Sequence, residues 1–466
     1  METLQRLHNR GSISTGYDVD NSVKLEKNND TTTIEFFERN VSSAGSRTTG
    51  TFSAWIKKTD ITTAQYLFTF GNVDNDNGRT FARFQTDGTL RIGGGSTVWR
   101  NTNRVFRDTS AWYHIVIAID TTQSTADNRF KIYVNGVQET SFSTTNNPSE
   151  DGTLGLNFGK QAIGYNTVDN NSGFNGYMSE VVIQDGVASA PTEFGEFDSS
   201  GIWIPKDASD ATMGTNGSYL KFENAGSMGA ATAGNSFTVQ NINQNDQATD
   251  TPTNNFATLN PLHYTTKYTI TEGATRQNSS ANGWGTSVGS IGVTSGKWYF
   301  EIKTPDTNGY TTFGAIDADS ILNQYLNGDA HAGDAPYGIS YCGGNGGIIV
   351  NGSYISGTSF PSYTTEIMGC ALDLDNNKIY FSKSGTYGNS GNPVTGANGM
   401  DLPTGGSGTW FFSTSTYSEP LDTNHGGYTS FTISSAATDA DGYGTFEYAP
   451  PSGYYALCTK NLEVYG

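Results

Sequence analysis

The sequence predicts an all-β protein made of two antiparallel β-sandwiches, and three observations support this fold class. Short apolar runs recur at intervals of about 8–15 residues, with polar turns and no helical periodicity between them. Charged residues make up only 15% of the chain, whereas glycine contributes 57 of its 466 residues. The 25 tyrosines and 25 phenylalanines supply the large apolar side chains that disordered chains lack.

The first sandwich is expected over residues 22–205. Residues 112–119 are almost entirely apolar or aromatic, as in a central strand that is buried on both faces. Residues 130–134 lead into Asn135-Gly136, which favours a two-residue hairpin turn because both turn positions need a positive φ. These patterns indicate consecutive antiparallel strands joined by tight turns.

The second sandwich is expected over residues 288–466. A strand is predicted at residues 297–303, and residues 368–382 have the pattern of a hairpin around a turn rich in Asp and Asn. Residues 206–287, between the sandwiches, are rich in Gly, Ala, Asn, Thr and Ser. Because a structureless loop of that length is uncommon, we expect a connector with a few short strands that pack on their neighbours.

The pattern of residues 1–21 differs from that of the rest of the chain. Leu4 and Leu7 lie three positions apart, which suits a short helix, and Gly11 with a Ser/Thr/Gly stretch follows. Two interpretations remain open, a frayed terminus and a docking peptide that becomes ordered against another protein. Of the two, we expect residues 1–21 to be a docking peptide.

The charge and cysteine content exclude several classes of function. The 26 Lys and Arg stand against 45 Asp and Glu, which gives a net charge of −19. This sign opposes binding to a polyphosphate backbone, so no nucleic acid is expected as a partner. No segment approaches the ~20 apolar residues of a membrane span, so no membrane insertion is expected. Three cysteines do not indicate a disulfide framework, and folding in a reducing cytoplasm is the simpler interpretation.

Three stretches of the first sandwich carry a family resemblance. They are residues 106–116 (FRDTSAWYHIV), 131–136 (KIYVNG) and 174–181 (FNGYMSEV). Together they resemble the laminin G-like branch of the concanavalin A-like jelly rolls, in which a W-Y-H-I strand, a Y-V-N-G hairpin and a closing G-Y-x-x-E-V strand occur in that order. The resemblance implies a jelly roll over residues 22–205, and calcium is common in such relatives.

The second sandwich has a resemblance of its own. Residues 296–302 (GKWYFEI) and 369–385 (GCALDLDNNKIYFSKSG) look like the early strand and late hairpin of a SPRY domain, a sandwich used for protein binding. Residues 449–462 (APPSGYYALCTKNL) resemble the ends of tailed-bacteriophage proteins that pair these two domains. The combination implies a virion structural protein.

Catalysis is not expected. Sugar-cleaving relatives of the jelly roll carry paired carboxylates in an E-x-D-x-x-E arrangement, and no such run is present. Glu180 and Asp185 are five positions apart, so on a regular strand they face opposite sides. His114 lies in a strong strand pattern without a nucleophile motif, which indicates a core or edge residue. We therefore expect no enzyme and no required cofactor.

One loop has the composition of a calcium site. Residues 74–78 read Asp-Asn-Asp-Asn-Gly, and carboxylate and amide oxygens are the ligands that calcium prefers, so Asp74 and Asp76 are candidate calcium ligands. The alternative is a plain hairpin tip, since the spacing does not match a full calcium loop. Further residues are candidates for a glycan-binding rim: Asn75, Asn77, Trp99, Tyr165, Asp169 and Asn170. The alternative for the two aromatic residues is a place in the core.

The expected function is that of a non-enzymatic phage virion protein, such as a tail fibre, spike or surface appendage that adheres to the host cell. It would be made in the host cytoplasm and lie on the virion surface, with other virion proteins of the capsid or tail and a host surface glycan or protein as partners. A homo-oligomer is expected, and a trimer is preferred because phage fibres are commonly trimers. Two alternatives remain: a capsid-decorating or tail-adaptor protein that binds only virion proteins, and a depolymerase of envelope polysaccharide.

Overall fold

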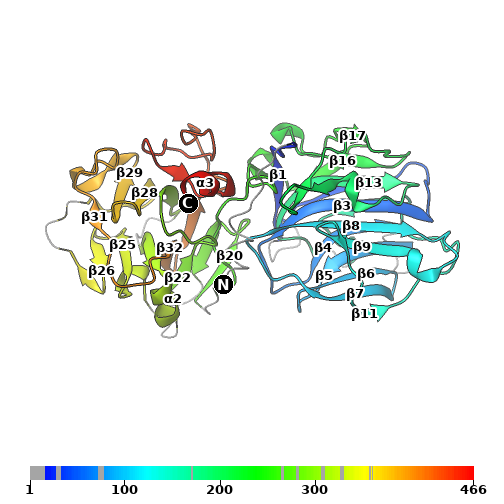
Figure 1. Ribbon diagram of the computed structural model, residues 1–466, viewed down its shortest axis with the longest axis horizontal. Helices are drawn as coiled ribbons and strands as arrows, with labels where there is room; N and C mark the ends of the chain where they lie inside the picture. The colour runs from blue at the N-terminus through cyan, green and yellow to red at the C-terminus, as the bar shows by residue number, and fades with distance from the viewer. Residues whose placement is uncertain are drawn as a thin grey trace. The chain divides into compact units, whose positions relative to one another are not determined.

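The protein folds into two compact units, one ending at Thr253 and the other beginning at Asn254. The computed structural model describes residues 16–27, 33–71, 78–168, 172–263, 267–279, 283–305, 310–325, 330–355, 358 and 360–466. In each unit, mainly antiparallel sheets enclose an apolar core, which confirms the all-β fold class (Figure 1). The residues expected to form a connector are divided between the units, with residues 206–253 in the first and 254–287 in the second.

The first unit is a sandwich of two large sheets, named sheet A and sheet B. Along sheet A the strands are, in order, β10 (Val137–Gln138), β9 (Phe130–Val134), β8 (Trp112–Asp120), β3 (Thr49–Lys58), β13 (Gly176–Asp185), β1 (Ser22–Leu25) and β19 (Gln247–Ala248), with β16 (Ser218–Leu220) paired to β13 and β17 (Ala233–Gly234) paired to β16. Along sheet B they are β11 (Phe142–Thr145), β7 (Thr97–Val105), β6 (Thr89–Gly94), β5 (Arg79–Phe84), β4 (Gln65–Gly71), β12 (Lys160–Ile163), β2 (Phe36–Asn40) and β18 (Thr238–Gln240).

The core of this unit is formed by the side chains that point inward, because successive side chains of a strand alternate between the two faces of its sheet. Side chains such as Phe52 and Ile117 from sheet A and Phe68 and Phe84 from sheet B are buried between the two layers. The outer face of sheet A is also covered, because the chain after β13 folds back over it. Strand β8 is therefore buried on both faces, as its apolar sequence predicts.

The Asn135-Gly136 turn between β9 and β10 has the predicted geometry, with φ of 48° at Asn135 and 77° at Gly136. Glycine is required at the second position for a further reason. The hairpin of β14 (Gly195–Phe197) and β15 (Trp203–Pro205) places the indole of Trp203 against it, and a methyl group at Gly136 would lie 2.3 Å from an indole carbon.

Gly136→Ala is therefore expected to destabilise the first unit by about 3 kcal/mol, from a left-handed alanine and a steric clash together. Gly201→Ala is the matched control, since Gly201 has a φ of 76° and nothing within 4 Å of the added methyl group. It should cost only about 1 kcal/mol. Urea unfolding of both variants measures the difference, and equal losses would contradict the packing role of Trp203.

The second unit is also a sandwich of two sheets, named sheet C and sheet D. Along sheet C the strands are β20 (Tyr268–Thr271), β21 (Arg276–Ser279), β33 (Pro420–Asn424), β23 (Lys297–Lys303), β28 (Ile367–Asp373), β29 (Lys378–Lys383) and β30 (Thr386–Tyr387), with β31 (Met400–Asp401) paired to β29 and β34 (Tyr455–Ala456) paired to β23. Along sheet D they are β22 (Trp284–Val288), β32 (Trp410–Tyr417), β24 (Thr311–Asp317), β25 (Gly338–Cys342), β26 (Ile348–Val350) and β27 (Ser353–Tyr354). The predicted hairpin is β28 and β29.

Short helices complete the two units. Within the described residues, the α-helices are α2 (Ala318–Tyr325) and α3 (Thr459–Tyr465), and the 3-10 helices are η2 (Ala126–Asn128), η3 (Pro191–Glu193), η4 (Ala225–Ser227), η5 (Gln244–Asp246), η6 (Ala332–Asp334) and η7 (Gly388–Ser390). None of the helices in the described parts of the chain is long and apolar enough to cross a membrane.

A buried carboxylate fixes the late part of the chain to sheet C. Glu301 on β23 is fully buried, and its two oxygens accept hydrogen bonds from the backbone N–H groups of Glu447 and Tyr448 at 2.9 and 2.8 Å. The amide of Asn424 and the hydroxyl of Tyr299 also donate to it, at 3.1 and 3.2 Å. The sequence around residue 447 is thereby attached to a strand that lies far away along the chain.

Candidate functional site

A row of polar side chains crosses the outer face of sheet B. Phe84 of β5 and Ile92 of β6 point into the core, so their neighbours Arg83 and Arg91 lie on the opposite face of the sheet. The register places Tyr66 of β4 opposite Arg83, Arg83 opposite Arg91, and Arg91 opposite Asn101 of β7. Four adjacent strands, labelled β4 to β7 in Figure 1, thus contribute one residue each.

Hydrogen bonds hold this row in place. Arg83 Nη1 donates to the hydroxyl of Tyr66 at 2.6 Å, and Arg91 Nε donates to Oδ1 of Asn101 at 3.2 Å. The amide of Asn101 in turn donates to Oγ of Ser143 on β11 at 2.9 Å. The row therefore extends over five strands to an exposed hydroxyl.

The two arginines form a like-charge pair. Burial and then the positive charge of Arg83 lower the pKa of the Arg91 guanidinium, while Asp87 in the β5–β6 turn opposes this shift. Within the described ranges, no carboxylate lies within 4.0 Å of a nitrogen of Arg83 or Arg91 as a salt-bridge partner. The pair is thus a local concentration of positive charge in a chain of net charge −19.

Aromatic rings support the guanidinium groups from below. The Arg83 guanidinium lies 5.2 Å from the ring centre of Tyr66 and 5.7 Å from that of Phe81, and Arg79 lies 5.1 Å from Phe81. Arg79 also donates to Oδ1 of Asn166 at 3.0 Å. Both rings are buried, so this face presents guanidinium groups rather than aromatic faces.

Comparison with known proteins assigns a family to part of each unit. Residues 20–192 match the concanavalin A-like lectin/glucanases superfamily, and residues 297–397 match the SPRY domain. The chain contains a domain of each kind. The polar row therefore belongs to the concanavalin A-like domain, and Glu301 to the SPRY domain.

Solved structures show only distant similarity, and a search of curated proteins gave no match. The SPRY domain of human HERC1 is 16% identical over 35% of this chain and 96% of that chain, with a TM-score of 0.28. A heptameric SAP-like pentraxin from Limulus polyphemus is 15% identical over 37% and 80%, with a TM-score of 0.29. A candidate carbohydrate-binding protein from Bacteroides ovatus is 17% identical over 38% and 46%, with a TM-score of 0.26.

The two aromatic residues expected at a glycan rim lie inside the concanavalin A-like domain. Trp99 is 6% exposed and packs in the core with its ring centre 5.7 Å from that of Phe130. Tyr165 is 8% exposed and stacks on Phe36 with 3.9 Å between ring centres. The expected sugar contact is not available to these rings, because packing inside the domain covers them.

The other candidates for a calcium or glycan site lie outside the described residues: Asp74, Asn75, Asp76, Asn77, Asp169 and Asn170. Within the residues that the structure describes, no group of three or more His, Cys, Asp or Glu side chains could hold a metal ion. The calcium prediction therefore stays a prediction.

Glu180 and Asp185 belong to separate networks of the concanavalin A-like domain. A β-bulge of β13 gives Glu180 a φ of 51°, and its Oε2 accepts hydrogen bonds from the hydroxyls of Tyr219 and, at 3.0 Å, Tyr17. Burial raises the pKa of Glu180 to about 7. Asp185 instead accepts bonds from the backbone N–H groups of Ser46 and Asn216 at 2.7 and 3.0 Å. The two carboxylates share no partner, so they do not form a glycosidase pair.

His114 lies in the core of the concanavalin A-like domain, as expected. The indole N–H of Trp203 donates to its Nδ1 at 2.9 Å, and its Nε2 lies 2.8 Å from Oγ of Ser53. Because an indole nitrogen only donates, Nδ1 accepts and the proton lies on Nε2. Burial lowers the pKa of His114 to about 3.

We therefore expect the ring nitrogens of His114 to show a single neutral tautomer, protonated on Nε2, with no titration between pH 8 and pH 5. Nitrogen chemical shifts from NMR measure this. Trp203→Phe removes the donor to Nδ1 and should move the pKa of His114 upward. A wild-type imidazole that titrates near its ordinary value of about 6.5 would contradict this assignment.

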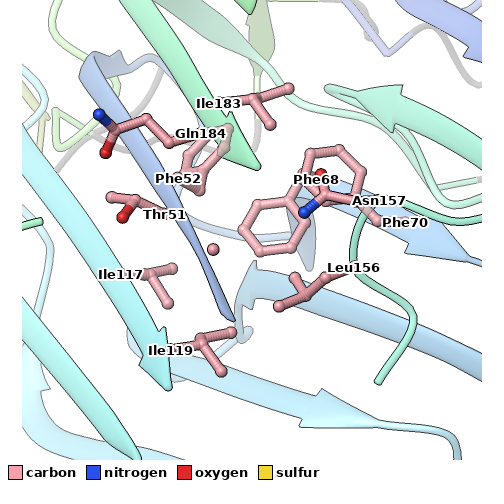
Figure 2. Close-up of a pocket in the computed structure, with 11 residues that line it drawn as sticks. Thr51, Phe52, Phe68, Phe70, Ile117, Ile119, Leu156, Asn157, Ile183 and Gln184 are labelled. Carbon is pink, nitrogen blue, oxygen red and sulfur yellow. The ribbon is translucent and has the colours of Figure 1, made fainter. Parts of the chain in front are cut away.

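The concanavalin A-like domain also contains a small cavity between its sheets (Figure 2). Its volume is about 10 Å³, and apolar side chains such as Phe52, Phe70, Ile117 and Leu156 point toward it. This space suits at most about one water molecule; its walls are mostly apolar, with Thr51, Asn157 and Gln184 as the polar residues that line it. The cavity is therefore a packing gap and not a ligand site.

Arg83 and Arg91 were not among the residues expected at a site. The sequence does contain a signal for them, because each stands between apolar residues that alternate toward the core on either side of the Asp87-Gly88 turn. Two arginines on paired strands around one tight turn must face the same side, and this places them next to each other.

Proposed function

We propose that the protein is a non-enzymatic binding protein and that its concanavalin A-like domain binds carbohydrate on the outer face of sheet B. The observation that carries the proposal is the row Tyr66–Arg83–Arg91–Asn101, in which the half-buried Arg83 and Arg91 present hydrogen-bond donors and the buried Tyr66 and Asn101 hold them in place on adjacent strands. Fixed donors on a sheet suit recognition, because little conformational freedom is lost when a ligand binds.

The arrangement of carboxylates supports binding over catalysis. Sugar cleavage by the usual route needs two carboxyl groups on either side of the scissile bond. Glu180 is buried and bound to tyrosine hydroxyls, and Asp185 caps backbone N–H groups elsewhere. Neither lies in the polar row. A depolymerase is therefore the weaker alternative.

We further propose that the protein is part of a phage virion, at its surface, with other virion proteins and a host surface glycan or protein as partners. This proposal comes from the pairing of the two domains and from the sequence of residues 449–462. A trimer would strengthen weak single-site contacts through multivalency. Location of the protein by cryo-electron microscopy of the intact particle tests the role, and burial of its sheet B against other subunits would favour an adaptor instead.

A glycan array with the full chain tests the binding function. We expect selective binding of a subset of glycans and no new reducing ends after long incubation. Binding lost in Arg91→Gln but kept in Lys206→Gln, an exposed position outside the row, would support sheet B as the surface. Absence of binding to all glycans, or release of reducing ends, would overturn the proposal.

A further inference from the structure

We infer that the outer face of sheet B recognises an acidic sugar, with one carboxylate or sulfate group held by Arg83 and Arg91. This inference rests on the proposed function and names the ligand class for the same surface. It goes beyond the proposed function because the positive charge of the two arginines selects acidic sugars among the possible carbohydrates.

The arginine pair carries an energetic cost. Arg83 and Arg91 are directly opposite on paired strands, so their Cβ atoms lie about 5 Å apart, and like charges in this position are destabilising. The chain has 45 acidic residues, yet none among the described residues forms a salt bridge with either arginine. An anionic group placed between the two guanidiniums would remove the repulsion.

In the part of the chain that the structure describes, several hydrogen-bond donors of the two guanidiniums remain without a protein acceptor. A guanidinium carries five N–H donors in a planar fork that fits a carboxylate or a sulfate. Among the described residues, Arg83 uses one nitrogen toward Tyr66 and Arg91 uses one toward Asn101. The Nε of Arg83 also lacks a hydrogen-bond partner there, but it is buried and cannot reach a ligand. The terminal nitrogens that remain on these two half-buried side chains are the donors that the pair can offer to a ligand.

The described residues around the arginine pair offer no open aromatic ring. Tyr66 and Phe81 lie beneath the guanidiniums, so a neutral sugar finds no open aromatic ring on which to stack. The neighbouring Ser143 hydroxyl is exposed and can bond to sugar hydroxyls. Recognition must then depend on the acidic group, with hydroxyl contacts at one end of the row.

The charge of the protein limits the size of the anionic ligand. A net charge of −19 repels long polyanions, and binding to a nucleic acid backbone needs many cationic contacts in succession. Sheet B provides two adjacent arginines, while Arg79 is engaged with Asn166. This number fits a single acidic group on a short glycan segment.

Isothermal titration of the full chain with three disaccharides of equal size tests the inference: one uncharged, one with a uronic acid and one with a sulfate ester. We expect the acidic ligands to bind at least about 10-fold more tightly than the uncharged one, and their affinity to fall as salt increases. Arg83→Gln and Arg91→Gln should each lower this affinity about 10-fold or more, and Arg91→Lys should lower it less because the charge remains. Lys206→Gln removes the same charge outside the row and should leave the affinity unchanged.

Inorganic sulfate separates the sugar from the acid group. We expect sulfate to compete only at far higher concentration than the acidic disaccharides, and competition at equal concentration would overturn the role of the sugar. Equal binding of the uncharged disaccharide, unaffected by the arginine variants, would overturn the inference but leave carbohydrate binding intact. If neither these ligands nor any arrayed glycan binds, both the inference and the proposed function fail. Circular dichroism of each variant confirms that it is folded.

Discussion

Glu301→Ala is expected to destabilise the SPRY domain by about 4 kcal/mol, a larger loss than most single substitutions cause. The carboxylate is fully buried and accepts four hydrogen bonds, two of them from the backbone N–H groups of Glu447 and Tyr448. Alanine would leave those buried donors without an acceptor and would also open a cavity. Urea unfolding, followed by a probe of the SPRY domain, measures the loss.

Two further variants make this prediction specific. Glu301→Gln keeps the volume of the side chain but replaces one carboxylate oxygen with an N–H₂ group. This group would face hydrogen-bond donors that the oxygen accepts in the wild type. The substitution should therefore still lower the free energy of unfolding by about 2 kcal/mol. Glu463→Ala removes an exposed carboxylate from α3 and should change stability by less than about 0.5 kcal/mol. A Glu301→Ala protein as stable as Glu463→Ala would show that the late segment does not depend on this carboxylate.

Glu180→Gln is expected to have the opposite effect, and only at high pH. Burial raises the pKa of Glu180 from about 4.5 to about 7, so its contribution to stability is fully present below pH 4.5 and is lost as the pH rises through 7. Glutamine stays neutral, and its oxygen can accept the hydroxyls of Tyr17 and Tyr219. The variant should exceed the wild type by less than about 1 kcal/mol at pH 5, where part of the contribution is already lost, and by roughly 3 kcal/mol at pH 9.

Urea midpoints of both proteins at pH 5, 7 and 9 test this prediction. His114 lies in the same domain, but it is common to both proteins and cancels in the difference. Glu193→Gln, at an exposed position of η3, is the control and should give a difference that does not change with pH. If the difference in stability between Glu180→Gln and the wild type did not change with pH, the carboxylate of Glu180 would not lie in a desolvated site.

The fold was predictable because local patterns are sufficient for strands and turns. The apolar run at residues 112–119 and the Asn135-Gly136 turn each predict a feature that the structure confirms. The contact between Trp203 and Gly136 could not be predicted in this way, since it joins segments that no local pattern relates. For Trp99 the sequence left two alternatives open, a glycan rim and the core, and the structure places it in the core.

The candidate site was harder to predict for a physical reason. Carboxylates are usually exposed, so nothing in the sequence marks Glu301 as buried; its partners Glu447 and Tyr448 are 146 and 147 positions away. The arginine row depends on the register of β5 and β6, which the turn between them determines. A search for polar residues that stand between core residues on both sides of a turn would have found Arg83 and Arg91.

The cluster of Trp55, His114 and Trp203 has an optical consequence. The imidazole contacts both indoles, with its ring centre 4.7 Å from that of Trp55 and 5.9 Å from that of Trp203. A protonated imidazole is a strong quencher of indole emission, whereas a neutral one is a weak quencher. Because this ring stays neutral while it is enclosed, the fluorescence of these two tryptophans keeps its brightness in mild acid and dims there only when the sandwich opens.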